Sequence, residues 1–552
     1  MATLNKSPQL RTQVLVYPRS CFVRFECIAV HLTIACLCVL AAHGQQRVAS
    51  IQGTIADPSG AVTPGATVSV TGTTARPSVR SNAAGVYARG GLFQGTYDVI
   101  AQAPGFAIGK RTVHLDATTN LVVSFKLAGA QASSVDKQPP AQTDLKLKFA
   151  VIVTRHGVRS PIRSVEELEA YSEAPWPAWG VAPGDLTPNG RKLMVMFGSY
   201  YRAYFAHNGL LSTAGCGDPN SIHIRADVDA RTQDTGRALA SGMMPGCSVD
   251  VHVSSTRKDP LFSPLAAGIG TPDRALAVAS IAGRIGGNPD AVVANHRQAF
   301  DTLRQVLFGC MPSVPCAAEE QRGKKTILRE PSSLGATEHG HMADIYGPLK
   351  VGSSLSESLQ LEYANGMTGE RLGWGRLTTA KLMDIMTLHA AYADLVRQTP
   401  YIARIQASNL LSHIVSSMQQ AVDNAPARGA LGKVGDRLLV IVGHDTNLSN
   451  IAGTLGISWL LNGYQRDDTP PGGALVFELW QDMNEEFTVR TYFTAQSLEQ
   501  MHSVLPISLK SPPLTSPIFI PGCSEGEQHM ACTWKGFQRT VESALDPEFV
   551  KP

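Results

Sequence analysis

The chain has 552 residues, of which 43% are hydrophobic and 17% are charged, and its formal net charge is +3. This length predicts more than one domain, and the composition is typical of a globular protein. So small a net charge on so long a chain excludes the strong basic excess of a typical nucleic-acid-binding protein.

The N-terminal region has the features of a secretory signal. Basic residues, the last of them Arg24, precede an apolar run over residues 28–42, and small residues stand at Ala42 and Gly44. These are the parts of a signal peptide, which we assign to residues 1–44. The run is short for a membrane span, and an uncleaved anchor is the alternative. We expect a periplasmic or secreted protein with no transmembrane segment in the mature chain.

Residues 47–128 predict a small β-sandwich. Alternating segments such as 66–71 and 97–102 are separated, roughly every eight to twelve residues, by Gly, Pro and Asn. The pattern Gly-x-Ile-x-Asp-Pro-x-Gly from Gly53, followed later by Gly-x-Tyr-x-Val from Gly95, resembles the carboxypeptidase regulatory-like domain. That resemblance implies a prealbumin-like sandwich without a defined ligand, and an envelope or glycan component is the partner we expect for it.

The remainder of the chain predicts a linker and a larger domain. Residues 129–143 are rich in Ala, Ser, Gln and Pro, which is typical of a flexible or extended linker. Over residues 144–552, apolar strand-like runs alternate with helical periodicities, which are clearest at 378–397 and 401–424. This alternation favours an α/β domain with a largely parallel sheet.

Two segments far apart in the sequence are built alike. Apolar residues 147–154 lead into Arg155-His156-Gly157, and apolar residues 438–442 lead into Gly443-His444-Asp445. In an open α/β sheet the ligand crevice lies outside the carboxyl ends of the strands, so we expect both histidines at one site. Either histidine alone is more often a structural residue.

The loop around His156 is suited to an anion. Arg155 and Arg159 carry planar, permanently charged guanidinium groups that match phosphoryl oxygens, and the loop contains no acid to neutralise them. A third arginine, Arg231, follows a possible strand at 222–225, and alone it is expected to be a surface or ion-paired residue. An ordinary polar turn is the alternative interpretation of the loop.

Phosphoryl transfer needs a nucleophile, cations around the transferred group and, for a poor leaving group, a proton donor. A neutral histidine can attack phosphorus. Asp445 can donate the proton if burial or a neighbouring phosphate raises its pKa. The set is complete without a metal or another cofactor, and the sequence has no CxxC or HExxH motif.

The sequences RHGVRSP at 155–161 and GHDTN at 443–447, with Arg231-Thr232 between them, resemble the paired signature of the histidine acid phosphatases. The similarity extends from about residue 145 to the C-terminus and is greatest to the periplasmic bacterial 4-phytases and glucose-1-phosphatases. It implies a phosphoglycerate-mutase-like α/β domain with a mixed, mostly parallel sheet and a helical insertion. It also implies a metal-independent phosphatase with an acidic optimum.

The resemblance implies a role for each matching residue. His156 would be the nucleophile that forms a phosphohistidine, and Asp445 would protonate the leaving oxygen. The phosphate would be held by four cationic or hydrogen-bonding side chains, Arg155, Arg159, Arg231 and His444.

The same resemblance bears on the substrate. The phytases have Thr-Lys after the RHGxRxP loop, whereas this chain has Ile162-Arg163, so a hydroxyl is lost and a cation is kept. We expect Arg163 to contact a second phosphate of a polyphosphorylated inositol. The HDTN form favours phytate over glucose 1-phosphate, and Glu357 matches an acidic pocket residue of the phytases, although a solvated helix face also explains it.

Six cysteines follow the leader, and an even number in an exported chain predicts disulfides, with about 15 possible connectivities. Pairing of sequence neighbours is the simplest arrangement: Cys216 with Cys247, Cys310 with Cys316, and Cys523 with Cys532. A metal site is the competing interpretation of these cysteines.

Two other functions stay open. The related mutase fold also uses an RHG histidine, but a signal peptide, disulfides and a distal His-Asp argue against a cytosolic sugar-phosphate mutase. The second alternative is a surface-binding protein in which the sandwich carries the function and the larger domain is inert. Retention of every expected catalytic residue argues against it.

Overall fold

The computed structural model describes residues 49–551 apart from 73–77, 104–105, 107–108, 117–119, 128–144, 311–322, 338–341 and 527–529. The predicted signal peptide and linker therefore lie outside the described residues. The chain divides into two compact units, one up to residue 141 and one from residue 142. No helix in the described part of the chain is both long and apolar enough to cross a membrane.

The first unit is a β-sandwich of two small sheets. One sheet contains β1 (Ala49–Ala56), β4 (Val86–Leu92), β7 (Asn120–Val122) and β8 (Phe125–Lys126). The other contains β2 (Thr67–Gly72), β3 (Val79–Arg80), β5 (Gly95–Gln102) and β6 (Gly109–Leu115). Their side chains alternate between the core and the exterior, and Ile51, Val68 and Tyr97 are among those that form the shared core. The predicted sandwich is confirmed.

The second unit is built on one mixed sheet. Its strands run in the order β11 (Val251–Val253), β10 (Ile222–Ala226), β14 (Leu438–Gly443), β9 (Lys146–Arg155), β15 (Ala474–Gln481), β16 (Phe487–Ala495) and β17 (Leu514–Pro517), with β18 (Cys532–Thr533) also paired to β16. The first four strands are parallel, and the others continue the sheet in antiparallel fashion. Strand β14 is buried throughout because helices cover both faces, which explains its continuous apolar sequence.

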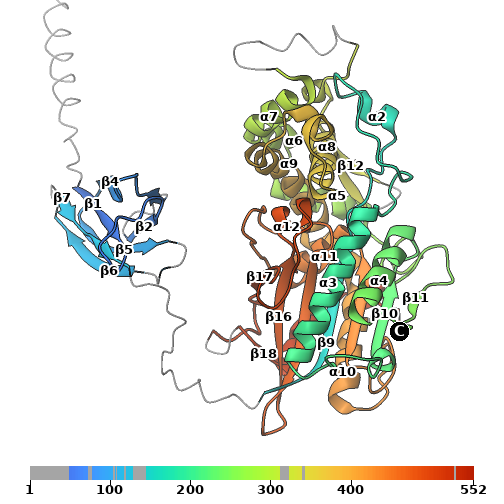
Figure 1. Ribbon diagram of the computed structural model, residues 1–552. Coiled ribbons are helices and arrows are strands. Elements are labelled where there is room, and N and C mark those ends of the chain that lie inside the picture. Colours follow the sequence, from blue (N-terminus) through green and yellow to red (C-terminus); the bar gives the residue numbers. More distant parts are fainter. Residues whose placement is uncertain are drawn as a thin grey trace, which may run out of the picture. The chain divides into compact units, whose positions relative to one another are not determined.

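Helices pack on both faces of this sheet (Figure 1). One face is covered by α3 (Pro188–His207) and α4 (Ala230–Met243), and the other by α10 (Pro400–Asp423), α11 (Asp445–Leu455) and α13 (Trp534–Ala544). Helices α3 and α4 approach closely because each presents a glycine to the other. A Cβ atom on Gly198 would overlap the carbonyl oxygen of Leu239, and one on Gly242 would overlap that of Val195.

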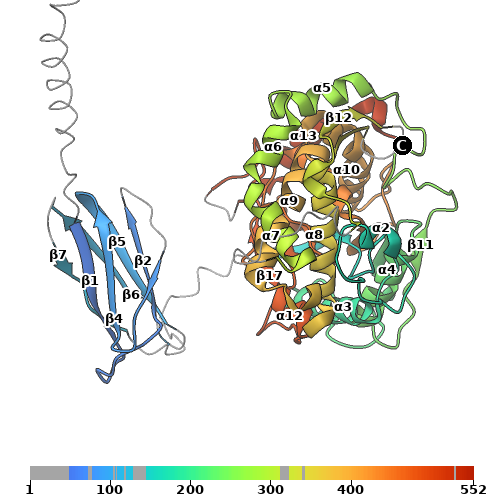
Figure 2. The same cartoon turned by 90° about the horizontal axis from the view of Figure 1, so that it is seen from above.

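A helical insertion separates β11 from β14 in the sequence. It contains α5 (Arg274–Arg284), α6 (Pro289–Asn295), α7 (Arg297–Phe308), the hairpin β12 (Ser333–Ala336) and β13 (Ala343–Tyr346), α8 (Pro348–Ala364) and α9 (Thr379–Arg397). Its helices gather at the upper end of the sheet in Figure 1, and Figure 2 shows them from above. Short helices α2 (Val165–Glu169) and α12 (Leu498–His502) lie outside it in the sequence. The helices predicted at 378–397 and 401–424 are α9 and α10.

Where the structure describes both cysteines of a predicted pair, each is bonded to its neighbour in the sequence. Disulfides join Cys216 to Cys247 and Cys523 to Cys532. Cys310 is also disulfide-bonded. Its predicted partner, Cys316, lies outside the described residues.

Candidate active site

Three neighbouring parallel strands bring the predicted residues to one edge of the sheet. Arg155 at the end of β9 is paired with Gly443 at the end of β14, and Ala226 at the end of β10 is paired with Val442. Each strand is followed directly by polar residues of the site. Because parallel strands end at the same edge, the loops meet there, as the sequence predicted for the two histidines.

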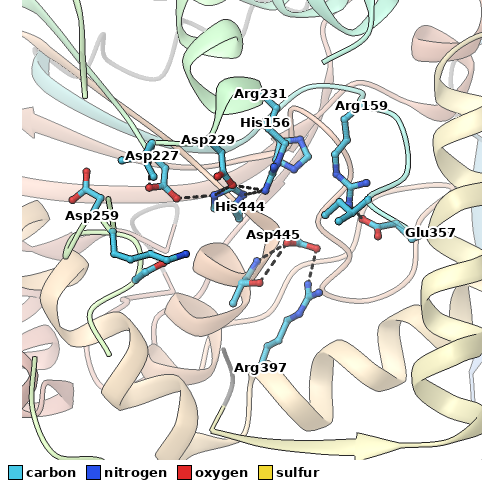
Figure 3. Close-up of a pocket in the computed structure, with 15 residues that line it drawn as sticks. His156, Arg159, Asp227, Asp229, Arg231, Asp259, Glu357, Arg397, His444 and Asp445 are labelled. Atoms are coloured by element: carbon cyan, nitrogen blue, oxygen red, sulfur yellow. Dashed lines mark hydrogen bonds and ion pairs between the residues drawn. The ribbon is translucent and has the colours of Figure 1, made fainter. Parts of the chain in front are cut away.

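A pocket of about 340 Å³ opens at this edge (Figure 3). Strand-end loops supply one part of its lining, and the insertion supplies Glu357 from α8 and Arg397 from α9. Five of the seven residues predicted for the site line it: His156, Arg159, Arg231, His444 and Asp445. The other two, Arg155 and Arg163, are not among the lining residues.

His156 is held as a neutral imidazole. Its side chain is buried, its Nδ1 lies 2.9 Å from the carbonyl oxygen of Gly157, and its backbone N–H donates to the Gly443 carbonyl. A carbonyl only accepts, so Nδ1 carries the proton and Nε2 keeps its lone pair. Burial, followed by the positive charges of Arg155 and Arg159, holds the pKa of His156 well below its usual value. Burial and these arginines therefore favour the neutral form of the ring.

His444 lies close to His156 but has different partners. The two ring centroids are 5.7 Å apart, and the rings meet edge to face. His444 Nε2 lies 2.8 Å from a carboxylate oxygen of Asp227 and 3.6 Å from one of Asp229. Its Nδ1 lies 3.3 Å from a guanidinium nitrogen of Arg231. A carboxylate only accepts, so Nε2 donates to Asp227 and Nδ1 accepts from Arg231.

Glu357 is ion-paired with both arginines of the loop around His156. It accepts a hydrogen bond of 3.0 Å from Arg159 and forms an ion pair with Arg155. Burial disfavours the charged carboxylate, but Arg159 and Arg155 outweigh burial and lower the pKa of Glu357 to about 2. Arg155 is fully buried, and its guanidinium also donates to the carbonyl of Thr469 at 2.7 Å. Arg155 thus lies behind the pocket wall.

Asp445 begins helix α11 and is ion-paired. Its carboxylate accepts a hydrogen bond of 2.7 Å from Arg397 and lies 3.8 Å from Arg155. Burial would raise the pKa of Asp445, but Arg397 and Arg155 outweigh burial and hold it well below the usual value. Proton donation by Asp445 was expected to need a raised pKa. In this structure the pKa of Asp445 is lowered instead, because Arg397 from the insertion lies against the carboxylate.

The departure at Ile162-Arg163 places an apolar side chain at the pocket. Ile162 lines it and is 60% exposed. Arg163 instead donates from Nε to the hydroxyl of Ser354 at 2.8 Å. Arg163 is thus anchored to helix α8, outside the pocket lining.

Several lining residues were not predicted as site residues. Arg397 ends a long helix and belongs to no motif, and Lys258 stands in a loop after β11. Asp227 and Asp229 were visible beside Arg231, but only the fold shows that both face His444. One sequence signal could have predicted this contact. Asp227 directly follows the short strand β10, and His444 directly follows the neighbouring strand β14.

Two groups of acidic and histidine side chains have ligand atoms within 4.8 Å of one another: Asp227, Asp229 and His444, and Glu357, His389 and Asp445. Each group already contacts a cation. Arg231 pairs with Asp229 at 2.6 Å, and Arg397 pairs with Asp445 at 2.7 Å. A metal ion at either place would compete with a fixed guanidinium.

Comparison with known proteins agrees with this geometry. Residues 146–286 and 333–494 match the Histidine phosphatase superfamily (branch 2), and residues 50–128 match the Carboxypeptidase regulatory-like domain. Phytase AppA of Escherichia coli is 34% identical over 414 residues, which cover 74% of this chain and 94% of that protein. Glucose-1-phosphatase of Providencia rettgeri is 26% identical over 413 residues, which cover 73% of this chain and 93% of that protein.

Solved structures give the same result. The phytase of Hafnia alvei in complex with tartrate superimposes with a TM-score of 0.68 at 32% identity, covering 75% of this chain and all of that chain. The phytase of Citrobacter braakii superimposes with a TM-score of 0.67 at 33% identity, covering 74% of this chain and all of that chain. The chain belongs to branch 2 of the histidine phosphatase superfamily and is a phosphoric monoester hydrolase of the histidine acid phosphatase type.

Proposed function

We propose that this protein is an exported, metal-independent acid phosphatase that forms a phosphohistidine at His156 and acts preferentially on phytate (myo-inositol hexakisphosphate). The observation that carries the proposal is the state of His156. Its Nδ1 is bound to the Gly157 carbonyl, and the pKa of its ring is held well below the usual value. Its Nε2 lone pair is therefore available at acidic pH, in a pocket that is also lined by Arg159, Arg231 and Arg397.

In the proposed reaction, Nε2 of His156 attacks phosphorus and the bond from phosphorus to the leaving oxygen breaks. Arg159 and Arg231 hold the equatorial oxygens through hydrogen bonds. His444, whose Nδ1 accepts from Arg231 and whose Nε2 donates to Asp227, positions Arg231. Arg155 acts from behind the pocket wall, through its charge and its pairing with Glu357.

Asp445 supplies the proton that the leaving oxygen takes up. A phosphate group in the pocket places negative charge near this carboxylate and opposes the effect of Arg397, so the pKa of Asp445 rises when substrate binds. In the second half of the reaction, water attacks the phosphohistidine, the bond from nitrogen to phosphorus breaks, and Asp445 takes a proton from the water.

Export is proposed from the sequence, with residues 1–44 as the signal peptide, 47–128 as the sandwich, 129–143 as a linker and 144–552 as the phosphatase domain. Disulfides at two predicted positions support an oxidising compartment. Binding of an envelope or glycan component by the sandwich stays a prediction.

A glucose-1-phosphatase or a broad-specificity acid phosphatase is the second candidate. The exposed Ile162 at the pocket favours it, because a hydroxyl expected in a phytase is missing there.

Phosphate release at about pH 4 to 5, an acidic range in which the proton donor is favoured, tests the proposal. The full chain is assayed with EDTA on phytate, glucose 1-phosphate and p-nitrophenyl phosphate. We expect phytate to have the highest kcat/KM and EDTA to have no effect. Equal or faster turnover of glucose 1-phosphate would favour the second candidate, and loss of activity with EDTA would refute metal independence.

A further inference from the structure

A second cavity adjoins the candidate active site, and apart from His444 its ionisable lining residues are Arg257, Lys258 and Arg274. Its volume is about 740 Å³, and it shares Lys258, Ser263, His444 and Thr446 with the lining of the first pocket. No Asp or Glu is among its lining residues. By contrast, five carboxylates line the first pocket: Asp227, Asp229, Asp259, Glu357 and Asp445.

The three cations of this second cavity are available to a ligand. Arg257, Lys258 and Arg274 are exposed, and none forms an ion pair with a residue in the described ranges. The arginines of the first pocket differ, because Arg159 is paired with Glu357 and Arg397 with Asp445. Unpaired guanidinium and ammonium groups around a concave surface raise the local concentration of anions and can bind phosphate oxygens directly.

The loop that carries Arg257 and Lys258 is anchored to the site. Asp259, next in sequence, is buried and accepts a hydrogen bond of 2.6 Å from Arg225. The carbonyl of Phe262 accepts a hydrogen bond of 3.0 Å from the side chain of Asn447, which in turn accepts from the backbone N–H of His444. The backbone of the loop that carries the two cations is therefore held in place relative to His444.

A polar group inside the second cavity is also without a protein partner. Asn450 is 2% exposed and lines the cavity, and its side-chain oxygen has no hydrogen-bond partner among the described residues. A buried amide of this kind costs stability unless a ligand or water completes its hydrogen bonds. A ligand that carries both phosphate and hydroxyl groups would satisfy it.

We propose that Arg257, Lys258 and Arg274 form a second anion subsite, which binds another phosphate of a polyphosphorylated substrate while the scissile phosphate lies against His156. Arg163 was expected to contact a second phosphate, but it lines neither cavity and its side chain donates to Ser354. The inference rests on the proposed function, since it assumes that the substrate carries more than one phosphate.

The test compares the wild-type chain with the variant Arg257→Ala/Arg274→Ala, which keeps Lys258 because that residue also lines the first pocket. The control carries Lys535→Ala/Arg539→Ala, which removes the same charge from exposed positions on α13. Steady-state kinetics are measured on phytate and on p-nitrophenyl phosphate. Inhibition of p-nitrophenyl phosphate hydrolysis is measured with myo-inositol hexakis sulphate and with inorganic phosphate.

For the subsite variant we expect the KM for phytate and the inhibition constant of the hexakis sulphate to rise about tenfold, with kcat little changed. The KM for p-nitrophenyl phosphate and the inhibition constant of inorganic phosphate should stay within about twofold, because a single phosphate does not reach the subsite. The control variant should behave like wild type.

The outcomes separate this inference from the proposed function. If wild type does not hydrolyse phytate but the subsite variant still weakens inhibition by the hexakis sulphate, the phytase proposal fails and the subsite stands. The subsite is refuted if the variant leaves the inhibition constant of the hexakis sulphate unchanged. It is also refuted if the inhibition constant of inorganic phosphate rises by the same factor, or if the control variant raises the inhibition constant of the hexakis sulphate as much as the subsite variant does.

Discussion

His156 and His444 stand at equivalent places but in opposite surroundings. Each directly follows one of two paired residues at the ends of neighbouring parallel strands. His156 is buried among arginines and bound to a backbone carbonyl, whereas His444 donates to Asp227 and lies near Asp229. The end of the strand determines where each histidine lies. The charged side chains that surround it, which come from other segments, determine which ring nitrogen carries a proton and what the ring can do.

The largest effect should come from removal of the nucleophile. His156→Ala should lower kcat on p-nitrophenyl phosphate by at least about a thousandfold, because the nitrogen proposed to attack phosphorus is removed. His444, the other histidine that lines the pocket, cannot replace it, because its Nε2 donates to Asp227. An alkali-quenched reaction with substrate radiolabelled in its phosphate should leave label on the wild-type chain and none on the variant, because the phosphorus–nitrogen bond of phosphohistidine is stable in alkali and labile in acid. Labelled variant protein, or activity within tenfold of wild type, would show that His156 is not the nucleophile.

Asp445→Asn should have the next largest effect, and it should depend on the leaving group. On phytate or glucose 1-phosphate, whose leaving alkoxides need a proton, we expect kcat to fall by about 10²- to 10⁴-fold. On p-nitrophenyl phosphate the loss should be much smaller, because nitrophenolate leaves without protonation. Equal losses on both kinds of substrate would contradict the role of general acid.

Asp227→Asn tests whether the hydrogen bond between His444 and the Asp227 carboxylate matters for activity. The amide keeps the shape but cannot act as the charged acceptor for Nε2–H, so we expect kcat/KM to fall about ten- to a hundredfold. Asp229→Asn is measured beside it, because its carboxylate lies 3.6 Å from the ring rather than 2.8 Å but also pairs with Arg231 at 2.6 Å. An Asp227 variant with kcat/KM within about twofold of wild type would show that the direct hydrogen bond to His444 does not matter for activity.

The smallest effect should be on stability, through Glu357. Its pKa is about 2 in the folded chain against an ordinary value of 4.5, so its contribution to stability is present above about pH 4.5 and is lost as the pH falls through 2. Glu357→Gln should lower the free energy of unfolding at pH 6 by about 1 kcal/mol and flatten its decline between pH 4.5 and 2.

Urea unfolding followed by tryptophan fluorescence measures this change. All six tryptophans lie after residue 144, so the signal reports on the larger unit and not on the sandwich. A variant whose stability declines with acid as steeply as that of wild type would show that the Glu357 pairs do not stabilise the fold.

Much of the architecture could be predicted from local pattern. Alternating segments gave the sandwich, and apolar runs that end in His156 and His444 gave two buried parallel strands and their meeting point. The antiparallel half of the sheet was not foreseen in detail, because β15 is largely buried, like the parallel strands, and its continuous apolar run does not reveal its direction.

Residues adjacent in the chain were enough to predict the strands, the two loops of the candidate site and the family resemblance, because periodicity and short motifs are local properties. The position of Arg155 behind the pocket, the ion pair between Arg397 and Asp445 and the unpaired cations of the adjoining cavity came only from the folded structure. Those properties arise from burial and from charges on segments distant in the sequence, and the energy of a charge depends on the neighbours that folding gives it.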